Sequence, residues 1–175
     1  AHNASNALAA CALAHLAGAP LSTLADGLRA SRGLPHRMRR VALRDGVAWF
    51  DDSKGTNVGA TVAALNGLSQ RTILILGGEG KGQDFSPLAP AVRARAAHVL
   101  LIGRDAPLIK RALAKEGVPI ESFASLEAAV ARAAKLAKPG DAVLLSPACA
   151  SFDMFRDYRQ RGEAFAAAVK ALGHD

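Results

Sequence analysis

Small and polar residues follow three apolar segments of the sequence, in patterns that suit the binding of phosphate or carboxylate groups. These polar stretches are residues 51–57 (DDSKGTN), 77–82 (GGEGKG) and 146–151 (SPACAS). In an open parallel α/β sheet, ligands collect at the carboxyl ends of the strands. Each stretch also leads into a helical pattern, and the N-terminus of a helix favours anions. The residues that this placement is expected to gather at one edge of a sheet are Lys54, Thr56, Lys81 and Ser151.

Each of these patterns also has a simpler interpretation. The glycine-rich stretch is not a P-loop, because Lys81 is followed by Gly82 rather than by Ser or Thr and Ile75 stands where the first Gly belongs. A cradle for an anion and a plain tight turn both remain open for it. The Asp51-Asp52 pair fits a solvated turn as well as a site. Cys149 lies between two alanines, which favours a packed thiol over a nucleophile.

Regular elements must position these stretches, and apolar segments predict the strands. They are expected at residues 72–76, 98–102 and 142–145, near Ile120, and in a hairpin of residues 41–44 and 47–50 around Asp45-Gly46. Helical patterns are expected at 57–68 with Thr56 as the N-cap, from Ser86-Pro87, and at 105–115, 125–138 and 151–172. Apolar strands that alternate with amphipathic helices indicate a parallel sheet covered on both faces. The prediction is an α/β, Rossmann-like domain.

The first part of the chain follows a different pattern. Residues 3–17 and 21–31 are rich in Ala and Leu and predict two helices. Residues 33–37 (GLPHR) interrupt the regular pattern, so we expect a domain boundary there. The chain begins at Ala1, within a helical pattern, which suggests a fragment of a longer protein.

Composition narrows the class of protein. Half of the 175 residues are hydrophobic and 21% are charged, which excludes intrinsic disorder. The formal charge of +7 favours an anionic partner, with nucleic acid, acidic lipid and nucleotide phosphate all open. Cys11 and Cys149 form neither a disulfide framework nor a zinc motif, and together with the lack of a visible secretion signal this predicts a cytoplasmic protein.

Several short motifs, taken together and in order, resemble the Mur ligase family over essentially the whole chain. DSKGTN combined with SPACAS is the most specific part of the resemblance. The motifs are HNASN at residues 2–6, LPHR at 34–37, DSKGTN at 52–57, GGEGK at 77–81, SPACASFDMF at 146–155 and RGEAF at 161–165. Within the family, the pattern is most similar to the type that adds D-glutamate to UDP-N-acetylmuramoyl-L-alanine.

The resemblance implies a part of a three-domain enzyme. Residues 1–33 would be the C-terminal helices of the central, ATP-binding domain, and residues 34–175 would be the Rossmann-like C-terminal domain. The implied reaction is ATP-dependent amide formation through an acyl-phosphate in peptidoglycan synthesis. The P-loop and most ligands of Mg²⁺ would lie upstream of this chain, which holds no metal ligands of its own by this interpretation and would be inactive alone.

The resemblance also assigns roles to individual residues. Lys54 and Arg37 would be catalytic, with Arg37 reaching the terminal phosphate, where a guanidinium spreads positive charge over the transferring group. The ATP site would use Asn3, Asn6, His36, Arg37 and Asp52. The D-glutamate pocket would use Thr56, Lys81, Ser151, Phe152 and Tyr158.

Two positions depart from the expected family pattern. Arg39 stands where many relatives have an acidic residue, and Tyr158 stands where a Phe is expected. The expected partners are ATP, D-glutamate and UDP-N-acetylmuramoyl-L-alanine, with no nucleic acid and no membrane, for a monomer. Another Mur-type ligase and a non-catalytic nucleotide-binding Rossmann module remain as alternatives.

Overall fold

The computed structural model describes residues 2–30 and 33–173, and side chains from residue 5 onward within these ranges. The chain divides into two compact units, Ala1–Leu34 and Pro35–Asp175. The first unit holds α1 (His2–Leu16) and α2 (Leu21–Ala30), which agree with the two predicted helices, although residue 31 lies outside the described part. Gly18 ends the first helix with a φ of +97°, a conformation that glycine adopts without strain.

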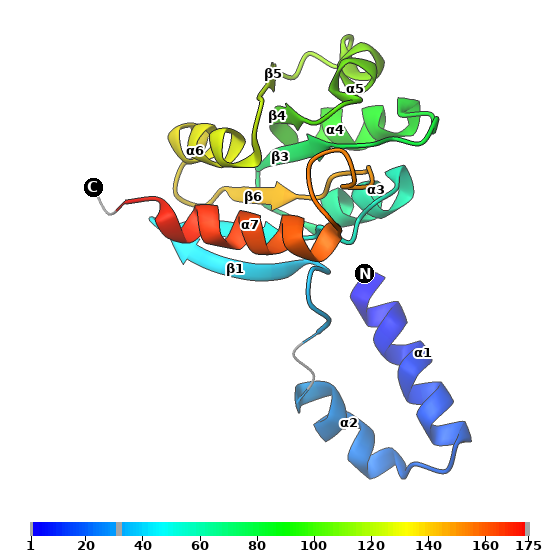
Figure 1. The fold of residues 1–175 in the computed structure, drawn as a ribbon. Helices are drawn as coiled ribbons and strands as arrows, with labels where there is room; N and C mark the ends of the chain where they lie inside the picture. Colours follow the sequence, from blue (N-terminus) through cyan, green and yellow to red (C-terminus); the bar gives the residue numbers. More distant parts are fainter. Residues whose placement is uncertain (1, 31–32, 174–175) are drawn as a thin grey trace. The chain divides into compact units, whose positions relative to one another are not determined.

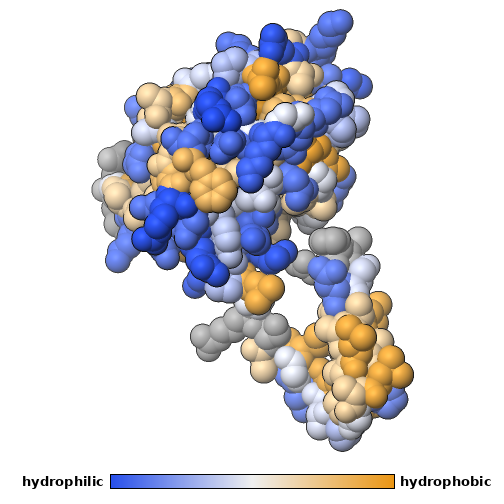
Figure 2. Space-filling view, turned by 45° about the vertical axis from the view of Figure 1, so that its right-hand side comes forward, coloured by the Kyte–Doolittle hydropathy of each residue, from blue (hydrophilic) through white to orange (hydrophobic). Residues whose placement is uncertain are grey.

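The first unit exposes much of its apolar side-chain surface. Leu8, Leu13, Leu16 and Leu21 are 72%, 68%, 83% and 66% exposed. In Figure 2, the helical part formed by the first unit carries a dense set of hydrophobic side chains on its surface. Single exposed leucines are common, but a group of this kind is atypical of the solvent-exposed surface of a complete domain.

The second unit is a mixed sheet between two layers of helices (Figure 1). Its strands are β1 (Arg39–Arg44), β2 (Val47–Asp51), β3 (Thr72–Gly77), β4 (Ala96–Ile102), β5 (Ile120–Ser122) and β6 (Ala142–Leu145). Its helices are α3 (Val58–Gly67), the 3₁₀ turn η1 (Ser86–Leu88), α4 (Ala89–Arg95), α5 (Ala106–Leu113), α6 (Leu126–Leu136) and α7 (Tyr158–Ala171). The strand order is β1-β2-β6-β3-β4-β5, and only the β1–β2 pair is antiparallel. The predicted α/β class with a mostly parallel sheet is confirmed.

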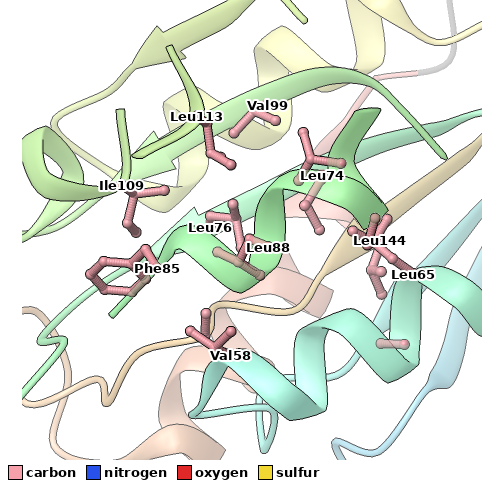
Figure 3. Packing of buried hydrophobic residues seen from close by; sticks show 14 of the residues in the cluster. Val58, Leu65, Leu74, Leu76, Phe85, Leu88, Val99, Ile109, Leu113 and Leu144 are labelled. Atoms are coloured by element: carbon pink, nitrogen blue, oxygen red, sulfur yellow. The ribbon is translucent and has the colours of Figure 1, made fainter. Parts of the chain in front are cut away.

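The period of two along each strand separates the core into two layers. On one face, Leu74, Leu76 and Leu144 pack against α3, α4 and α5. Figure 3 shows side chains of α3, η1 and α5 meeting those of β3, β4 and β6. On the other face, Ile73 and Ile75 pack against α6 and α7. Because successive strand residues point to opposite faces, an uninterrupted apolar strand supplies both layers.

Two predicted helix N-caps were wrong. Asn57, rather than Thr56, caps α3, since its side chain accepts a hydrogen bond from the Ala60 amide. Ser86 does not cap the following helix; its hydroxyl donates to Asp84 at 2.6 Å.

The last helix begins at Tyr158 rather than near Ser151, because the Asp157 side chain accepts the Gln160 amide and fixes the helix start there. Residues 151–157 form turns instead. Among the residues that the structure describes, no helix is both long and apolar enough to cross a membrane.

Candidate ligand site at the carboxyl edge of the sheet

Residues 51–57, 77–82 and 146–151 form three loops around a topological switch point at the carboxyl end of β6, a region named the crevice. Strand β6 lies between β2 and β3. The helices that follow β2 and β3 cover one face of the sheet, whereas α7, which follows β6, covers the other. The loops after β6 and after its two neighbours therefore leave in opposite directions, and ligands bind where this reversal occurs.

Direct contacts join the three predicted loops at this edge. Glu79 and Ala150 form an antiparallel bridge, with both backbone hydrogen bonds at 2.9 Å. Gln83 donates to the Ala148 carbonyl at 2.6 Å and accepts the Val58 amide at 3.1 Å. The glycine-rich stretch is thus fixed against the other two loops, as the strand pattern predicts.

The first amides of α3 are occupied by the chain itself. Val58 donates to Gln83, and Ala60 donates to Asn57 at 2.9 Å. The expectation that this helix N-terminus offers its amides to an anion is therefore not supported for these two groups. The positive charge at the site comes from side chains, chiefly Lys54 and Lys81.

Asp52 is held by the fold from two sides. Asp52 is 7% exposed. Its Oδ2 atom accepts a hydrogen bond from the Ser146 hydroxyl at 2.7 Å, and its Oδ1 atom accepts one from the Met38 amide at 3.1 Å. Burial raises the pKa of Asp52, while the hydrogen bonds from Ser146 and Met38 oppose this rise. The carboxylate thus connects the loop after β2, the loop after β6 and the segment before β1.

The neighbouring Asp51 holds His36. Their Nδ1 and Oδ2 atoms are 2.6 Å apart, and both side chains are largely buried. A side chain at Gly162 would collide with both of them, with its Cβ 2.8 Å from Asp51 Oδ2. His36 itself has a φ of +59°, a strained conformation for a residue with a Cβ. The His36 imidazole is therefore engaged within the second unit, and Arg37 beside it is exposed.

Arg161 is the residue that the sequence interpretation missed. It is 1% exposed and lies in α7. Its guanidinium donates to the Ser53 hydroxyl and carbonyl, both at 3.0 Å, to the Cys149 carbonyl at 3.0 Å and to the Ala150 carbonyl at 3.3 Å. Burial lowers the pKa of Arg161 to about 10. The RGEAF motif was the only signal of this residue in the sequence.

Two lysines lie over aromatic rings at the same edge. The Nζ atom of Lys54 is 4.1 Å from the centroid of the Tyr158 ring, and that of Lys81 is 5.3 Å from the centroid of the Phe152 ring. Lys81 has a φ of +52° within the turn after β3. Phe152 is 63% exposed, so its ring borders the solvent.

The remaining predicted residues differ in their surroundings. Ser151 is 2% exposed, and Thr56 is half-buried in the loop that carries Lys54. Asn6 is exposed on α1 in the first unit, and the side chain of Asn3 lies outside the described residues. Cys149 is fully buried, which raises the pKa of its thiol to about 12 and agrees with a packed role. Within the described residues, no three His, Cys, Asp or Glu side chains are grouped to hold a metal ion.

Comparison with known sequences identifies the second unit. Residues 36–149 match the family model of the Mur ligase, glutamate ligase domain. The UDP-N-acetylmuramoylalanine–D-glutamate ligases of Burkholderia mallei and Burkholderia pseudomallei are each 62% identical over 171 residues, which is 98% of this chain. The chain spans about a third, 34%, of the length of these curated relatives.

Solved structures share the fold at low sequence identity. The UDP-N-acetylmuramate-alanine ligase MurC of Thermotoga maritima has a TM-score of 0.72 at 17% identity, covering 98% of this chain and 38% of its own. MurF of Acinetobacter baumannii has a TM-score of 0.71 at 17% identity, covering 96% of this chain and 37% of its own. The matched residues, which include every loop of the crevice up to Cys149, show that the chain belongs to the Mur ligase family.

Proposed function

We propose that this chain is part of an ATP-dependent ligase that joins D-glutamate to UDP-N-acetylmuramoyl-L-alanine. The observation that carries the proposal is the 62% identity, over 98% of the chain, to curated ligases named for that reaction. The proposed chemistry is activation of the muramoyl-alanine carboxylate as an acyl-phosphate, followed by attack of the D-glutamate amine. ATP and a nucleotide-linked precursor are its substrates, so we place the protein in the cytoplasm.

The cationic side of the crevice suits the reacting groups. Lys54 is assigned to the reacting phosphate and amino acid, and the exposed Arg37 to the terminal phosphate. Each would stabilise negative charge that develops during phosphoryl and acyl transfer. Asp52 is assigned to the ribose, although both of its oxygens already accept a hydrogen bond from the chain. Asn3, Asn6 and His36 complete the proposed ATP contacts; because His36 is bound to Asp51, it would act by shaping the segment that carries Arg37.

A dicarboxylate fits the other side of the crevice. Lys81 offers an ammonium for the side-chain carboxylate of D-glutamate, in a turn fixed by the Glu79–Ala150 bridge. The hydroxyls of Thr56 and Ser151 and the rings of Phe152 and Tyr158 would border the same pocket.

The proposal also assigns the two parts of this chain to domains of the enzyme. Residues 1–33 are proposed to end the central, ATP-binding domain, and residues 34–175 to form the C-terminal domain. The exposed leucines of α1 and α2 support this assignment, because apolar side chains grouped on a surface mark a site of contact with other parts of a protein. Most ligands of Mg²⁺ are proposed to lie in other parts of the ligase.

The test is an assay of the complete ligase for phosphate release in the presence of ATP and UDP-N-acetylmuramoyl-L-alanine. Release should require D-glutamate and should not occur with L-glutamate or diaminopimelate. Turnover with diaminopimelate instead would favour another Mur-type ligase. Steeply salt-dependent binding of a DNA oligomer with no D-glutamate effect would favour the nucleic-acid alternative.

Lys81→Ala provides a sharper prediction for the pocket. Loss of its ammonium should raise the KM for D-glutamate by about tenfold or more and leave the KM for ATP nearly unchanged, because the charge faces a substrate carboxylate. Steady-state kinetics with each substrate varied in turn measures both constants. Lys110→Ala, on the exposed surface of α5, is the matched control. Equal increases in both KM values would reject the assignment.

A further inference from the structure

The closest cation–ring contact at the crevice joins Lys54 to Tyr158. The Lys54 ammonium is 4.1 Å from the ring centroid, compared with 5.3 Å for Lys81 over Phe152. A cation within about 6 Å of an aromatic face is attracted by the ring quadrupole. We propose that Tyr158 is a positioning residue whose ring holds the Lys54 ammonium in place for the reaction. This inference rests on the proposed function of Lys54.

The Tyr158 ring is itself held from several directions. The Ser53 hydroxyl donates to the Tyr158 carbonyl at 2.8 Å, which joins the start of α7 to the residue next to Lys54. The His36 ring meets the Tyr158 ring edge-on, with centroids 6.0 Å apart and an interplanar angle of 80°. His36 is fixed in turn by Asp51. The platform under Lys54 is therefore built into the fold.

Arg161 strengthens the same connection. Its guanidinium binds both the hydroxyl and the carbonyl of Ser53, one turn after Tyr158 in α7. The loop that carries Lys54 and the helix start that carries Tyr158 are thus joined by backbone and side-chain contacts. A shift of one would move the other, so the ammonium and the ring keep their relative position.

A neutral platform suits a lysine that must meet an anion. Lysine has a flexible four-carbon stem, and ordering it costs rotamer entropy. Within the described part of the chain, no carboxylate lies within ion-pair distance of the Lys54 ammonium. A carboxylate partner would neutralise the charge, whereas the ring restricts the side chain and leaves the charge available to a phosphate or carboxylate oxygen.

The contact can be measured on the 175-residue chain without any assay of activity. In NMR spectra of a selectively lysine-labelled sample, the ε-methylene protons of Lys54, assigned with Lys54→Arg, should be shifted upfield by the ring current of Tyr158. Tyr158→Leu should remove the shift and Tyr158→Phe should restore it. Phe152→Leu is the matched control, because it should affect Lys81 and leave the Lys54 signal in place. The absence of an upfield shift in the unaltered chain would overturn the proposal.

Kinetics of the complete ligase then separate positioning from substrate binding. Tyr158→Leu should lower kcat by about three- to thirtyfold, the range expected for a cation–π contact, with a smaller effect on the KM for D-glutamate. Tyr158→Phe should rescue most of this loss, since it keeps the ring. A Phe variant as impaired as the Leu variant, or a loss confined to the KM for D-glutamate, would overturn the proposal.

A third substitution keeps the test decisive if the Leu variant folds poorly. Trifluorinated phenylalanine at position 158 preserves the ring volume and weakens its negative face, so kcat should fall below that of the Phe variant. Equal kcat values for the two rings would contradict the inference. Failure of the unaltered ligase to turn over D-glutamate would refute the proposed function instead, while the NMR measurement would still decide the contact.

Discussion

Asp52 is buried, and its ionisation lowers the free energy of unfolding of the second unit. Its pKa is raised, chiefly by burial, from an ordinary value of 3.8. Between that value and the higher pKa of the folded state, the folded chain binds more protons than the unfolded chain. The free energy of unfolding therefore falls as the pH rises through this window, and above it the full cost of ionisation is present.

Asp52→Asn removes this ionisation while keeping an oxygen for the Met38 amide. The variant should gain stability relative to the unaltered chain as the pH rises above about 3.8, until the difference levels off. Urea unfolding at closely spaced pH values measures the difference. Asp157→Asn is a control of opposite sign, because hydrogen bonding to the Gln160 amide lowers the pKa of Asp157 and makes its ionised form stabilising. A pH-independent difference for Asp52→Asn would contradict the assigned cause.

At the scale of elements, the sequence predicts those helices and strands that depend on residues close together in the chain. Strand β3 was predictable because residues 73–76 form an uninterrupted apolar run, which the structure buries fully. The β1–β2 hairpin was predictable because Asp45 and Gly46 adopt φ values of +50° and +74°, which these residue types tolerate. The start of α7 was not, since Phe152 and Phe155 continue a helical spacing through residues whose backbone turns instead.

The candidate site shows the same division. Lys54, Lys81 and Ser151 could be placed at one edge because each follows a recognisable strand. The role of Arg161 could not be predicted, because its partner Ser53 is 108 residues away in the sequence. The His36–Asp51 contact was missed for a related reason: it depends on a strained backbone at His36 and on the space left by Gly162.

Arg161, in the first turn of α7, holds two loops of the crevice by hydrogen bonds to Ser53, Cys149 and Ala150. Arg161→Lys should lower the free energy of unfolding by about 3 kcal/mol, because a single ammonium cannot replace a buried guanidinium that binds four oxygens. Urea unfolding measures the loss, and amide hydrogen exchange should become faster in residues 51–57 and 146–151. Arg111→Lys, on the exposed surface of α5, should change stability by less than about 0.5 kcal/mol. A similarly small loss for Arg161→Lys would show that the loops are held by other contacts.

At the scale of the whole molecule, the two units differ in how completely they bury their apolar residues. Both core layers of the second unit are built from residues after Pro35, on the two faces of one sheet. The first unit instead exposes Leu8, Leu13, Leu16 and Leu21. A chain of residues 35–175 should therefore unfold cooperatively with a Tm within about 2 °C of the full chain, since little of its stability would come from the first unit.

The same truncation should lower the binding of an apolar dye such as ANS, because the exposed leucines are removed. Calorimetry and dye fluorescence of the two chains test both expectations. Substituting Leu8, Leu13 and Leu16 together by Gln in the full chain should reproduce the loss of dye binding without shortening the protein. A Tm lowered by more than about 5 °C on truncation would mean that α1 and α2 support the sheet domain directly. An unchanged Tm together with reduced dye binding would show that the leucines bind the dye without contributing to the stability of the second unit.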